Sequence, residues 1–369
     1  MTDPALRYPG TVPSTGGTAV TTILIVKTGA LGDVLRTTSI LPGLRERYTD
    51  CRVTWITAPA AVDLVRSNPL VAEVVALDVK SAHAVDELQA RLSRTAWDRV
   101  LSFDDEEPLC RLVSALPTKR LSGAYLESDG RRAYTPDVGP WFDMGLLSVH
   151  GKQVADRMKV DNRRSHPEIL TSMLGLPMGK PELEFEPRHA DFARAFFERH
   201  APAAGGPLVG LNTGAGGRWR SKMLTPECTA DVAERVSRAL GGRVTFVLFG
   251  GADERERNTR IAGLLRERVR VADAGVDNAL LEFAALVARC DLLVTSDSLA
   301  LHVALARNVR CVAFFAPTSA AEIEMYGLGE KVVSTAPDYC SYKPDADTSS
   351  LTPERVADAV LRQLAHVSR

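Results

Sequence analysis

At 369 residues, the chain is longer than one hydrophobic core comfortably serves, so we expect two domains. Its 45% hydrophobic and 25% charged residues are typical of a soluble globular protein, and it contains no run of 18 apolar residues that would span a membrane. The 45 Lys and Arg residues nearly balance the 46 Asp and Glu residues. This balance excludes an overall attraction to nucleic acid and leaves at most a peripheral contact with a membrane.

The six cysteines are scattered, and none forms a C-x-x-C pair. They favour reduced thiols in a cytoplasmic protein over a disulfide framework or a zinc site. Residues 1–22 are rich in Pro, Gly, Ser and Thr, and they lack the charged start and apolar core of a signal peptide. We interpret them as a flexible leader.

Strands and helices alternate from residue 23 onward. The apolar run 23–27 predicts a buried strand, and after a glycine-bearing turn the spacing from Val34 predicts a helix to about Tyr48, with a kink at Pro42. The same alternation predicts strands at 52–57, 74–77, 99–103 and near Arg120, and helices at 60–66, 83–94 and 109–116. Strands separated by helices indicate a parallel sheet covered on both faces. Residues 23–200 are therefore predicted to form a doubly wound α/β domain.

The segment from Ser122 to Pro187 is less regular and mixes Gly, Pro, aromatic residues and clustered Arg. Such a segment is typical of a binding lid or an inserted surface element. A helix at 190–200 and a hinge-like stretch at 201–207 are expected to close the first half.

The second half, residues 207–350, repeats the pattern. It predicts strands at 208–212, 244–249, 269–272, 292–295 and 311–314, and helices that begin near residues 225, 253, 278 and 298. Thr-Pro-Glu at 225–227 and again at 352–354 places an N-cap threonine, a proline and an acid at a helix start. The second of these signatures opens a terminal helix to about Leu364.

Two loops of the second half have residues suited to a phosphorylated ligand. Gly214 to Gly217 follow the first strand, with Lys222 shortly beyond, but neither a Walker A loop nor a G-x-G-x-x-G fingerprint is present. A plain surface turn is the alternative. Glu254 follows another strand end and is suited to accept ribose hydroxyls, although a purely structural role is equally open. The adjacent Asp253 suits a helix N-cap.

The stretch 294–306 is typical of a buried strand that passes into a helix N-terminus, where a phosphate is stabilised. Asp297 suits a ligand contact or a helix cap, and His302 suits a ligand contact or a satisfied core position. In the first half, Asp33 suits a general base or a helix cap. The acidic run 104–107 favours an acceptor with amines, whereas the clustered arginines, Arg163 among them, favour an anionic one.

Five motifs in this order resemble glycosyltransferase family 9, the family of the ADP-heptose lipopolysaccharide heptosyltransferases. They read ILIVKTGALGDVLRTTSILPGLRERY, NTGAGGRWRSK, FGGADERER, VTSDSLALHVALA and FFAPTSAAEIEMYG, and they span most of the chain from Ile23 to about Val333. The resemblance implies the GT-B architecture, in which two Rossmann-like domains face a central cleft. The first domain would hold the acceptor, the second would hold the nucleotide sugar, and a C-terminal helix at 351–369 would cross back to the first domain.

The resemblance also implies roles for single residues. Asp33 matches the catalytic aspartate of an inverting enzyme that needs no metal or other cofactor, Lys222 matches the lysine near the diphosphate, and Glu254 matches the ribose-binding glutamate. The expected donor-binding residues are Thr213, Gly214, Lys222, Glu254, Asn278, Asp297, Ser298, Leu299 and His302. The expected acceptor-binding residues are Lys27, Arg36, Asp104, Asp105 and Arg163.

The sequence departs from the family pattern at three places. Leu299 stands where the family usually has glycine, Gly29 and Ala30 replace a hydroxyl pair, and the acidic run replaces a polar segment. We expect transfer of a heptosyl or related sugar from ADP-heptose to a hydroxyl of a surface glycan or a secondary metabolite. A nucleotide-sugar epimerase and a non-catalytic nucleotide-sugar-binding protein are the alternatives.

Overall fold

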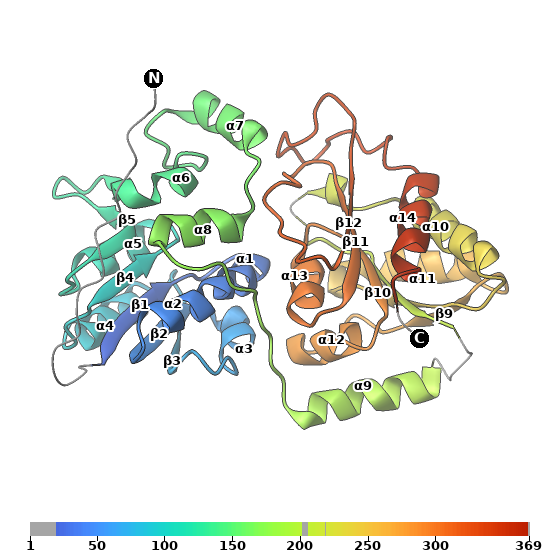
Figure 1. The fold of residues 1–369 in the computed structure, drawn as a ribbon, viewed down its shortest axis with the longest axis horizontal. Helices are drawn as coiled ribbons and strands as arrows, with labels where there is room; N and C mark the ends of the chain where they lie inside the picture. Colours follow the sequence, from blue (N-terminus) through green and yellow to red (C-terminus); the bar gives the residue numbers. More distant parts are fainter. Residues whose placement is uncertain (1–19, 201–205, 218, 368–369) are drawn as a thin grey trace, which may run out of the picture.

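The computed structural model describes residues 20–200, 206–217 and 219–367. It contains two sheets, each with helices on both faces, which lie side by side along the long axis of the molecule (Figure 1). The expected leader falls largely outside the described residues, as does most of the expected hinge, because residues 1–19 and 201–205 are not among them. In the part of the chain that is described, no helix is long and apolar enough to cross a bilayer.

The first sheet has the strand order β3-β2-β1-β4-β5-β6, and only β6 runs antiparallel. Its central strand is built from an apolar run, Ile23 to Val26, that is fully buried because helices cover both faces. The strands are β1 (Thr21–Val26), β2 (Cys51–Thr57), β3 (Glu73–Ala76), β4 (Arg99–Ser102), β5 (Leu121–Leu126) and β6 (Arg132–Tyr134). The first five confirm the predicted strands to within a few residues.

The predicted helix after β1 is divided into two. It runs as α1 (Leu31–Thr37), a 3-10 turn (Thr38–Ile40) and α2 (Leu41–Arg47). Pro42 lies in the first turn of α2, where its missing N–H costs nothing, so the interruption falls just before it. The other helices that flank this sheet are α3 (Val62–Val65), α4 (Ala82–Leu92) and α5 (Glu107–Ser114).

The segment expected to be irregular is more ordered than predicted. It contains the β5–β6 hairpin, followed by α6 (Gly139–Phe142), α7 (Lys152–Asp161) and α8 (His166–Leu174). Helix α8 starts with a capping box, in which the Ser165 side chain accepts from the Glu168 N–H and the Glu168 carboxylate accepts from the Ser165 N–H. The Ser-x-x-Glu spacing was therefore a usable sequence signal for this helix.

The second sheet is parallel throughout, with the order β12-β11-β10-β7-β8-β9. Its strands are β7 (Leu208–Asn212), β8 (Thr245–Phe249), β9 (Arg270–Asp273), β10 (Leu292–Ser296), β11 (Arg310–Phe315) and β12 (Gly329–Val333). Its helices are α10 (Pro226–Ala239), α11 (Arg255–Leu265), α12 (Leu280–Val287) and α13 (Leu299–Ala306). In each sheet the order reverses beside the first strand, and ligands bind at such a switch point in open α/β sheets.

The two domains meet through apolar packing as well as polar contacts. Helix α1 packs on α13, and α3 packs on α12. One continuous hydrophobic cluster therefore includes Leu35 and Leu64 of the first domain and Leu286 and Leu301 of the second. This contact places the loop after β1 opposite the carboxyl edge of the second sheet.

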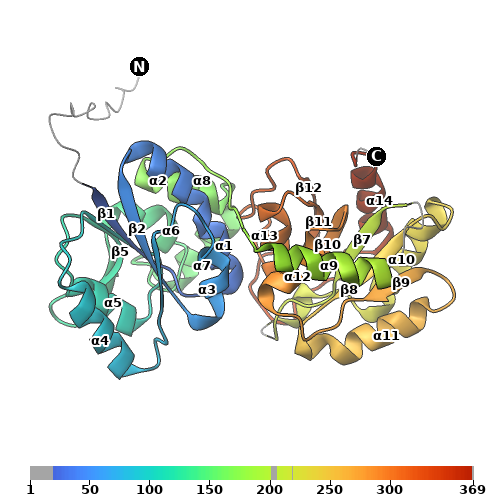
Figure 2. The same cartoon turned by 90° about the horizontal axis from the view of Figure 1, so that it is seen from below.

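The C-terminal helix differs from the expectation drawn from the family. Helix α14 (Pro353–Leu364) packs on α10, β11 and β12 of the second domain, at the far end from the first (Figure 1). Its buried face, which includes Val356 and Val360, completes the apolar cluster under that side of the second sheet, so burying it elsewhere would expose both surfaces. The connection between the domains is made instead by α9 (Pro187–His200), which follows the first domain but packs on α12 (Figure 2). The domain boundary expected at residue 200 thus falls after a helix that lies against the second domain.

Candidate functional site

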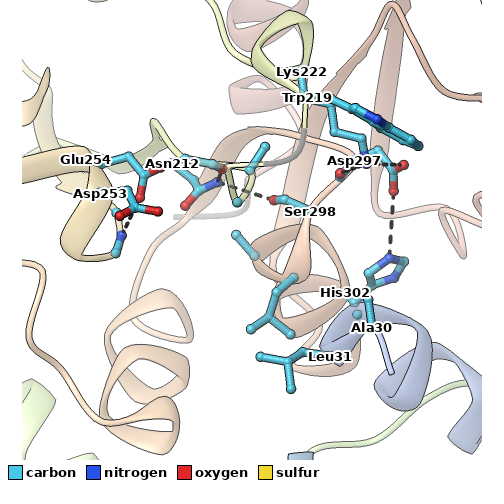
Figure 3. A pocket seen from close by; sticks show the side chains of 18 of the residues that line it. Ala30, Leu31, Asn212, Trp219, Lys222, Asp253, Glu254, Asp297, Ser298 and His302 are labelled. Atoms are coloured by element: carbon cyan, nitrogen blue, oxygen red, sulfur yellow. Dashed lines mark hydrogen bonds and ion pairs between the residues drawn. The ribbon is translucent and has the colours of Figure 1, made fainter. Parts of the chain in front are cut away.

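A cavity of about 800 Å³ lies between the two domains. Its first-domain wall is the start of α1, including Asp33 and Arg36. Its second-domain wall is formed by segments that follow the carboxyl ends of β7, β8, β9, β10, β11 and β12, as Figure 3 shows for the residues around Asn212, Glu254 and Asp297. The cavity therefore occupies the switch point of the second sheet and faces the loop after the first strand of the first sheet.

Asn212, at the end of β7, connects the loops at the switch point by hydrogen bonds. Its side-chain amide donates to the Gly214 carbonyl at 2.7 Å, to Thr295 Oγ1 at 3.1 Å and to Ser298 Oγ at 3.3 Å. These bonds join the glycine loop to the strand end that precedes α13. Asn212 lies within the motif NTGAGGRWRSK, but its sequence position alone did not predict this role.

The glycine loop packs tightly against Glu254. A Cβ atom at Gly214 would lie 2.5 Å from the Glu254 carboxyl carbon, so no larger residue fits there without moving the carboxylate. Glu254 lines the cavity and is mostly buried, and its Oε2 accepts from the Gly251 N–H at 2.8 Å. Among the described residues, its Oε1 has no hydrogen-bond partner, which leaves it available to a ligand.

Two of the expected donor-binding side chains form hydrogen bonds within the protein that stabilise loops. The Thr213 hydroxyl donates to Asn258 Oδ1 at 2.5 Å and to the Phe249 carbonyl at 3.0 Å, and Thr213 does not line the cavity. Asn278 does line the cavity, but its amide donates to the Ala274 carbonyl at 2.9 Å. Both side chains support the cavity wall through the backbone.

Lys222, Asp297 and His302 form a cluster on the side of the cavity away from Glu254 (Figure 3). Lys222 Nζ lies 3.0 Å from Asp297 Oδ2 and donates to the Asp297 carbonyl at 2.8 Å, and His302 Nε2 lies 3.9 Å from Asp297 Oδ1. Burial works to raise the pKa of Asp297, but the Lys222 charge outweighs it and holds that pKa below its ordinary value. Burial and the Arg36 charge lower the pKa of His302 to about 4, so its imidazole is neutral at neutral pH.

Leu299 does not obstruct the helix N-terminus. Ser298 is the residue before α13, and Ser298, Leu299 and Ala300 all line the cavity. The Leu299 side chain packs against the hydrophobic cluster between the domains, while the first turn of α13 stays at the cavity wall. The backbone N–H groups of that turn and the positive end of the helix dipole therefore face a site suited to a phosphate.

Asp33 lies in the first turn of α1 and is not its N-cap, which is Ala30. Its Oδ1 accepts an ion-pair contact from Arg36 Nη2 at 2.9 Å, its side chain is 38% exposed, and no described residue pairs with its Oδ2. Partial burial works to raise the pKa of Asp33, but the charges of Arg36 and Lys27 hold it below its ordinary value. The cavity wall thus presents an ionised carboxylate with one free oxygen.

Of the expected acceptor-binding residues, only Arg36 lines the cavity. Lys27 and Asp104 are buried and form an ion pair with each other, and Asp104 also accepts from the Thr28 hydroxyl at 2.8 Å. Burial opposes the charged form of Lys27, but Asp104 outweighs it and raises the Lys27 pKa. This ion pair joins the residues that follow β1 and β4 at the switch point of the first sheet, so both side chains have partners within the protein.

Asp105 and Arg163 lie outside the cavity. The Asp105 carbonyl accepts from Arg132 at 2.7 Å, and the exposed Arg163 donates to the Val160 and Asn162 carbonyls at 2.9 and 3.0 Å. Neither side chain faces the space between Asp33 and Lys222.

Replacing Asp104 with alanine is expected to lower the free energy of unfolding by about 3–5 kcal/mol, because it leaves the Lys27 ammonium buried without its counter-charge. Urea denaturation measures the change, and Asp105→Ala is the matched control from the same acidic run. An Asp104→Ala protein with unaltered stability would contradict this structural role.

Gly32 permits the close approach of α1 and α13. A Cβ atom there would lie 2.6 Å from His302 Cδ2. Gly32→Ala is therefore expected to destabilise the protein by about 1–3 kcal/mol, the usual cost of overpacking. By contrast Gly263→Ala, in an exposed part of α11 with open space around it, should stabilise the fold by about 0.5–1 kcal/mol. Equal midpoints of urea unfolding for the two variants would show that the domains do not pack as described.

The cavity is also lined by Trp219, Glu322 and Tyr342, for which the sequence predicted no role. Trp219 and Glu322 lie within two of the family-like motifs, and Tyr342 lies in a segment with no recognised motif. The Tyr342 hydroxyl donates to Glu322 Oε1 at 2.9 Å, and Glu322 Oε2 lies 3.9 Å from Arg36 Nη1. A carboxylate within a family-like motif at a strand end was the signal available for Glu322. Among the described residues, no group of three or more His, Cys, Asp or Glu side chains is arranged to hold a metal ion.

Comparison with known proteins agrees with this geometry. The family model described as glycosyltransferase family 9 (heptosyltransferase) matches residues 149–351, and a search of curated proteins found no match. The fold is similar to that of a glycosyl transferase family 9 protein from Veillonella parvula, at 21% identity and a TM-score of 0.75, over 94% of this chain and 97% of that one.

Two structures from E. coli are also similar to the fold of this chain. ADP-heptose lps heptosyltransferase II has 18% identity and a TM-score of 0.64, over 93% of this chain and 98% of that one. Heptosyltransferase WaaC with ADP has 16% identity and a TM-score of 0.59, over 94% and 99%. The match of the family model to more than half of the chain and the shared GT-B fold confirm the expected family: the chain belongs to glycosyltransferase family 9.

Proposed function

We propose that the protein transfers a heptosyl or closely related unit from ADP-heptose to an acceptor hydroxyl, with inversion at the anomeric carbon. One observation carries this proposal. The free carboxylate oxygen of Asp33 and the phosphate-binding elements of the second domain line the same cavity from opposite sides. An acceptor hydroxyl beside Asp33 would thus approach the sugar from the face opposite the diphosphate.

In the proposed reaction, Asp33 accepts the proton of the acceptor hydroxyl while its oxygen forms a bond to the anomeric carbon. The bond between that carbon and the phosphate oxygen breaks, and ADP leaves with the electron pair. The Lys222 ammonium and the N-terminus of α13 stabilise the negative charge that develops on the diphosphate. Since these groups supply positive charge where the leaving group forms, we propose that transfer needs no metal and continues in the presence of a chelator.

The rest of the cavity suits a nucleoside. The free Oε1 of Glu254 is placed to accept ribose hydroxyls, and Val276, Leu280 and Phe283 offer an apolar wall for a base. The similar E. coli heptosyltransferase WaaC was solved with ADP, which supports adenine as the base. The six cysteines are unpaired, which fits a reaction in the reducing cytoplasm, where we place it.

Calorimetric titration with ADP-heptose and with UDP-, GDP- and dTDP-sugars tests the donor. We expect one ADP-heptose per chain and weaker binding of the other nucleotides. Gly214→Leu should abolish binding because its side chain would collide with Glu254. Tight binding of another nucleotide sugar, or binding unchanged in Gly214→Leu, would overturn the assignment of donor or site.

A further inference from the structure

Glu322 is the cavity carboxylate whose role the proposed transfer leaves unexplained. It follows β11, its side chain is 12% exposed, and the Tyr342 hydroxyl fixes its orientation at 2.9 Å. Its cationic neighbour Arg36 lies 3.9 Å away and forms a closer pair with Asp33, at 2.9 Å. Glu322 therefore keeps part of its negative charge for a group in the cavity.

Two aromatic rings lie near this carboxylate. Trp219 and Tyr342 both line the cavity, and their rings meet edge to face with centroids 5.6 Å apart. Lys222 Nζ lies 5.0 Å from the centroid of the Trp219 ring, so Tyr342 is the ring that stands beside Glu322 for another cation. Aromatic faces beside a carboxylate are a favourable environment for an ammonium group, since the ring quadrupole and the carboxylate both attract a cation.

The chain itself places an ammonium at this position. Lys159 Nζ, from helix α7 of the first domain, lies 4.3 Å from the centroid of the Tyr342 ring. Burial raises the pKa of Glu322, and Arg36 and Lys159 are among the charges that oppose this rise, so the Lys159 charge reaches Glu322. Helix α7 buries only Ala155, so little packing holds Lys159 in place.

The charges of the cavity also favour a cation. Among the described residues, five carboxylates line it, Asp33, Asp253, Glu254, Asp297 and Glu322, against the cationic Arg36 and Lys222. The pairs Asp33–Arg36 and Lys222–Asp297 account for both cations. A donor diphosphate adds further negative charge, which a phosphorylated acceptor would increase and an amine would reduce.

We propose that Glu322 and Tyr342 form a subsite for a protonated amine of the acceptor, and that Lys159 occupies this subsite until the acceptor displaces it. The inference rests on the proposed transfer reaction and narrows its acceptor to amine-bearing molecules. The acidic run 104–107 and the clustered arginines favour acceptors of opposite charge. The proposed subsite favours a cationic acceptor, through Glu322 rather than through the run 104–107.

Three sugars that differ in charge test the subsite: glucosamine below the pKa of its amine, N-acetylglucosamine and glucose 6-phosphate. Ligand-observed NMR in the presence of ADP measures their affinities. We expect glucosamine to bind about tenfold more tightly than N-acetylglucosamine, as a partly buried charge-assisted hydrogen bond implies. Glu322→Gln should bring this ratio to about one, whereas Glu324→Gln, on the same loop but outside the cavity lining, should leave it unchanged.

Lys159→Ala gives a second readout. If Lys159 occupies the amine subsite, its removal raises glucosamine affinity about threefold, and Lys152→Ala on the same helix changes nothing. If Lys159 instead bound an anionic acceptor, its removal would weaken binding of glucose 6-phosphate. Glucose 6-phosphate as the tightest ligand, weakened by Lys159→Ala, would overturn the proposal. So would undetectable glucosamine binding, or a preference for glucosamine over N-acetylglucosamine that Glu322→Gln retains.

Calorimetry with ADP on the same samples distinguishes failure of the subsite from failure of the proposed function. Loss of ADP binding would refute the proposed function, whereas intact ADP binding without an amine preference would refute only the subsite.

Discussion

Replacing Asp33 with asparagine is expected to lower kcat by about a hundredfold or more while ADP affinity stays nearly unchanged, because the variant removes the proposed proton acceptor and keeps the shape of the side chain. Asp33 faces the cavity with one free carboxylate oxygen, and Arg36 keeps that carboxylate ionised at neutral pH. The substitution adds no volume, and the loops proposed to bind the donor belong to the other domain. Steady-state kinetics gives kcat, and calorimetry gives the affinity for ADP.

The matched control for this variant is Asp63→Asn. Asp63 forms the same i,i+3 pair with an arginine, Arg66 on α3, but it does not line the cavity. We expect its kcat to match that of the unmodified protein. If Asp33→Asn retained full turnover, the general base would have to lie elsewhere, and a non-catalytic role for the cavity would gain support.

The Lys222→Met variant is expected to lower kcat by about a hundredfold to a thousandfold, the usual cost of removing one group that stabilises developing charge. Methionine keeps most of the apolar length of lysine, so the chief loss is the ammonium beside Asp297. Without it, the buried Asp297 carboxylate loses its principal counter-charge, and its pKa should rise. Donor affinity should fall as well, because in the proposed reaction the lysine also attracts the diphosphate of the bound donor.

Lys119→Met provides the comparison, since Lys119 pairs with Asp98 at 2.6 Å on the surface of the first domain. That variant should react at the unmodified rate. Equal kcat values for Lys222→Met and Lys119→Met would show that the diphosphate does not leave beside Lys222.

The sheets and the location of the cavity could be predicted because both depend on local patterns. Buried apolar runs such as 23–27 and 292–295 define parallel strands wherever helices separate them, and the structure has strands at both. The carboxyl ends of parallel strands meet at one edge, so Glu254, Lys222 and Asp297 were expected together from their positions after strands. The structure brings all three to the cavity wall.

The direction in which a side chain points at a strand end could not be predicted. Lys27, Asp104 and Thr213 follow strands just as Asp297 does, yet the first two pair with each other and the third bonds to Asn258. Whether such a residue faces a ligand or the interior depends on which partner lies within hydrogen-bond distance. That partner is distant in sequence, 77 residues away for Lys27.

Packing between segments far apart in sequence accounts for the other errors. The amphipathic pattern of α14 predicted a helix correctly, but either domain could have covered its apolar face, and α10 does so. Glu322 and Tyr342 reach the cavity through two separate loops, and neither loop indicates by its own sequence that it will meet Arg36.

The stereochemical course of transfer tests the account most directly. Methanol is a suitable surrogate acceptor because a methyl glycoside, once formed, does not mutarotate. With ADP-heptose and methanol, NMR of the product should show an anomeric configuration opposite to that of the donor and one ADP released per glycoside. Asp33→Asn should form the glycoside at least about a hundredfold more slowly. A product of retained configuration, a donor isomerised without ADP release, or full activity in Asp33→Asn would contradict it.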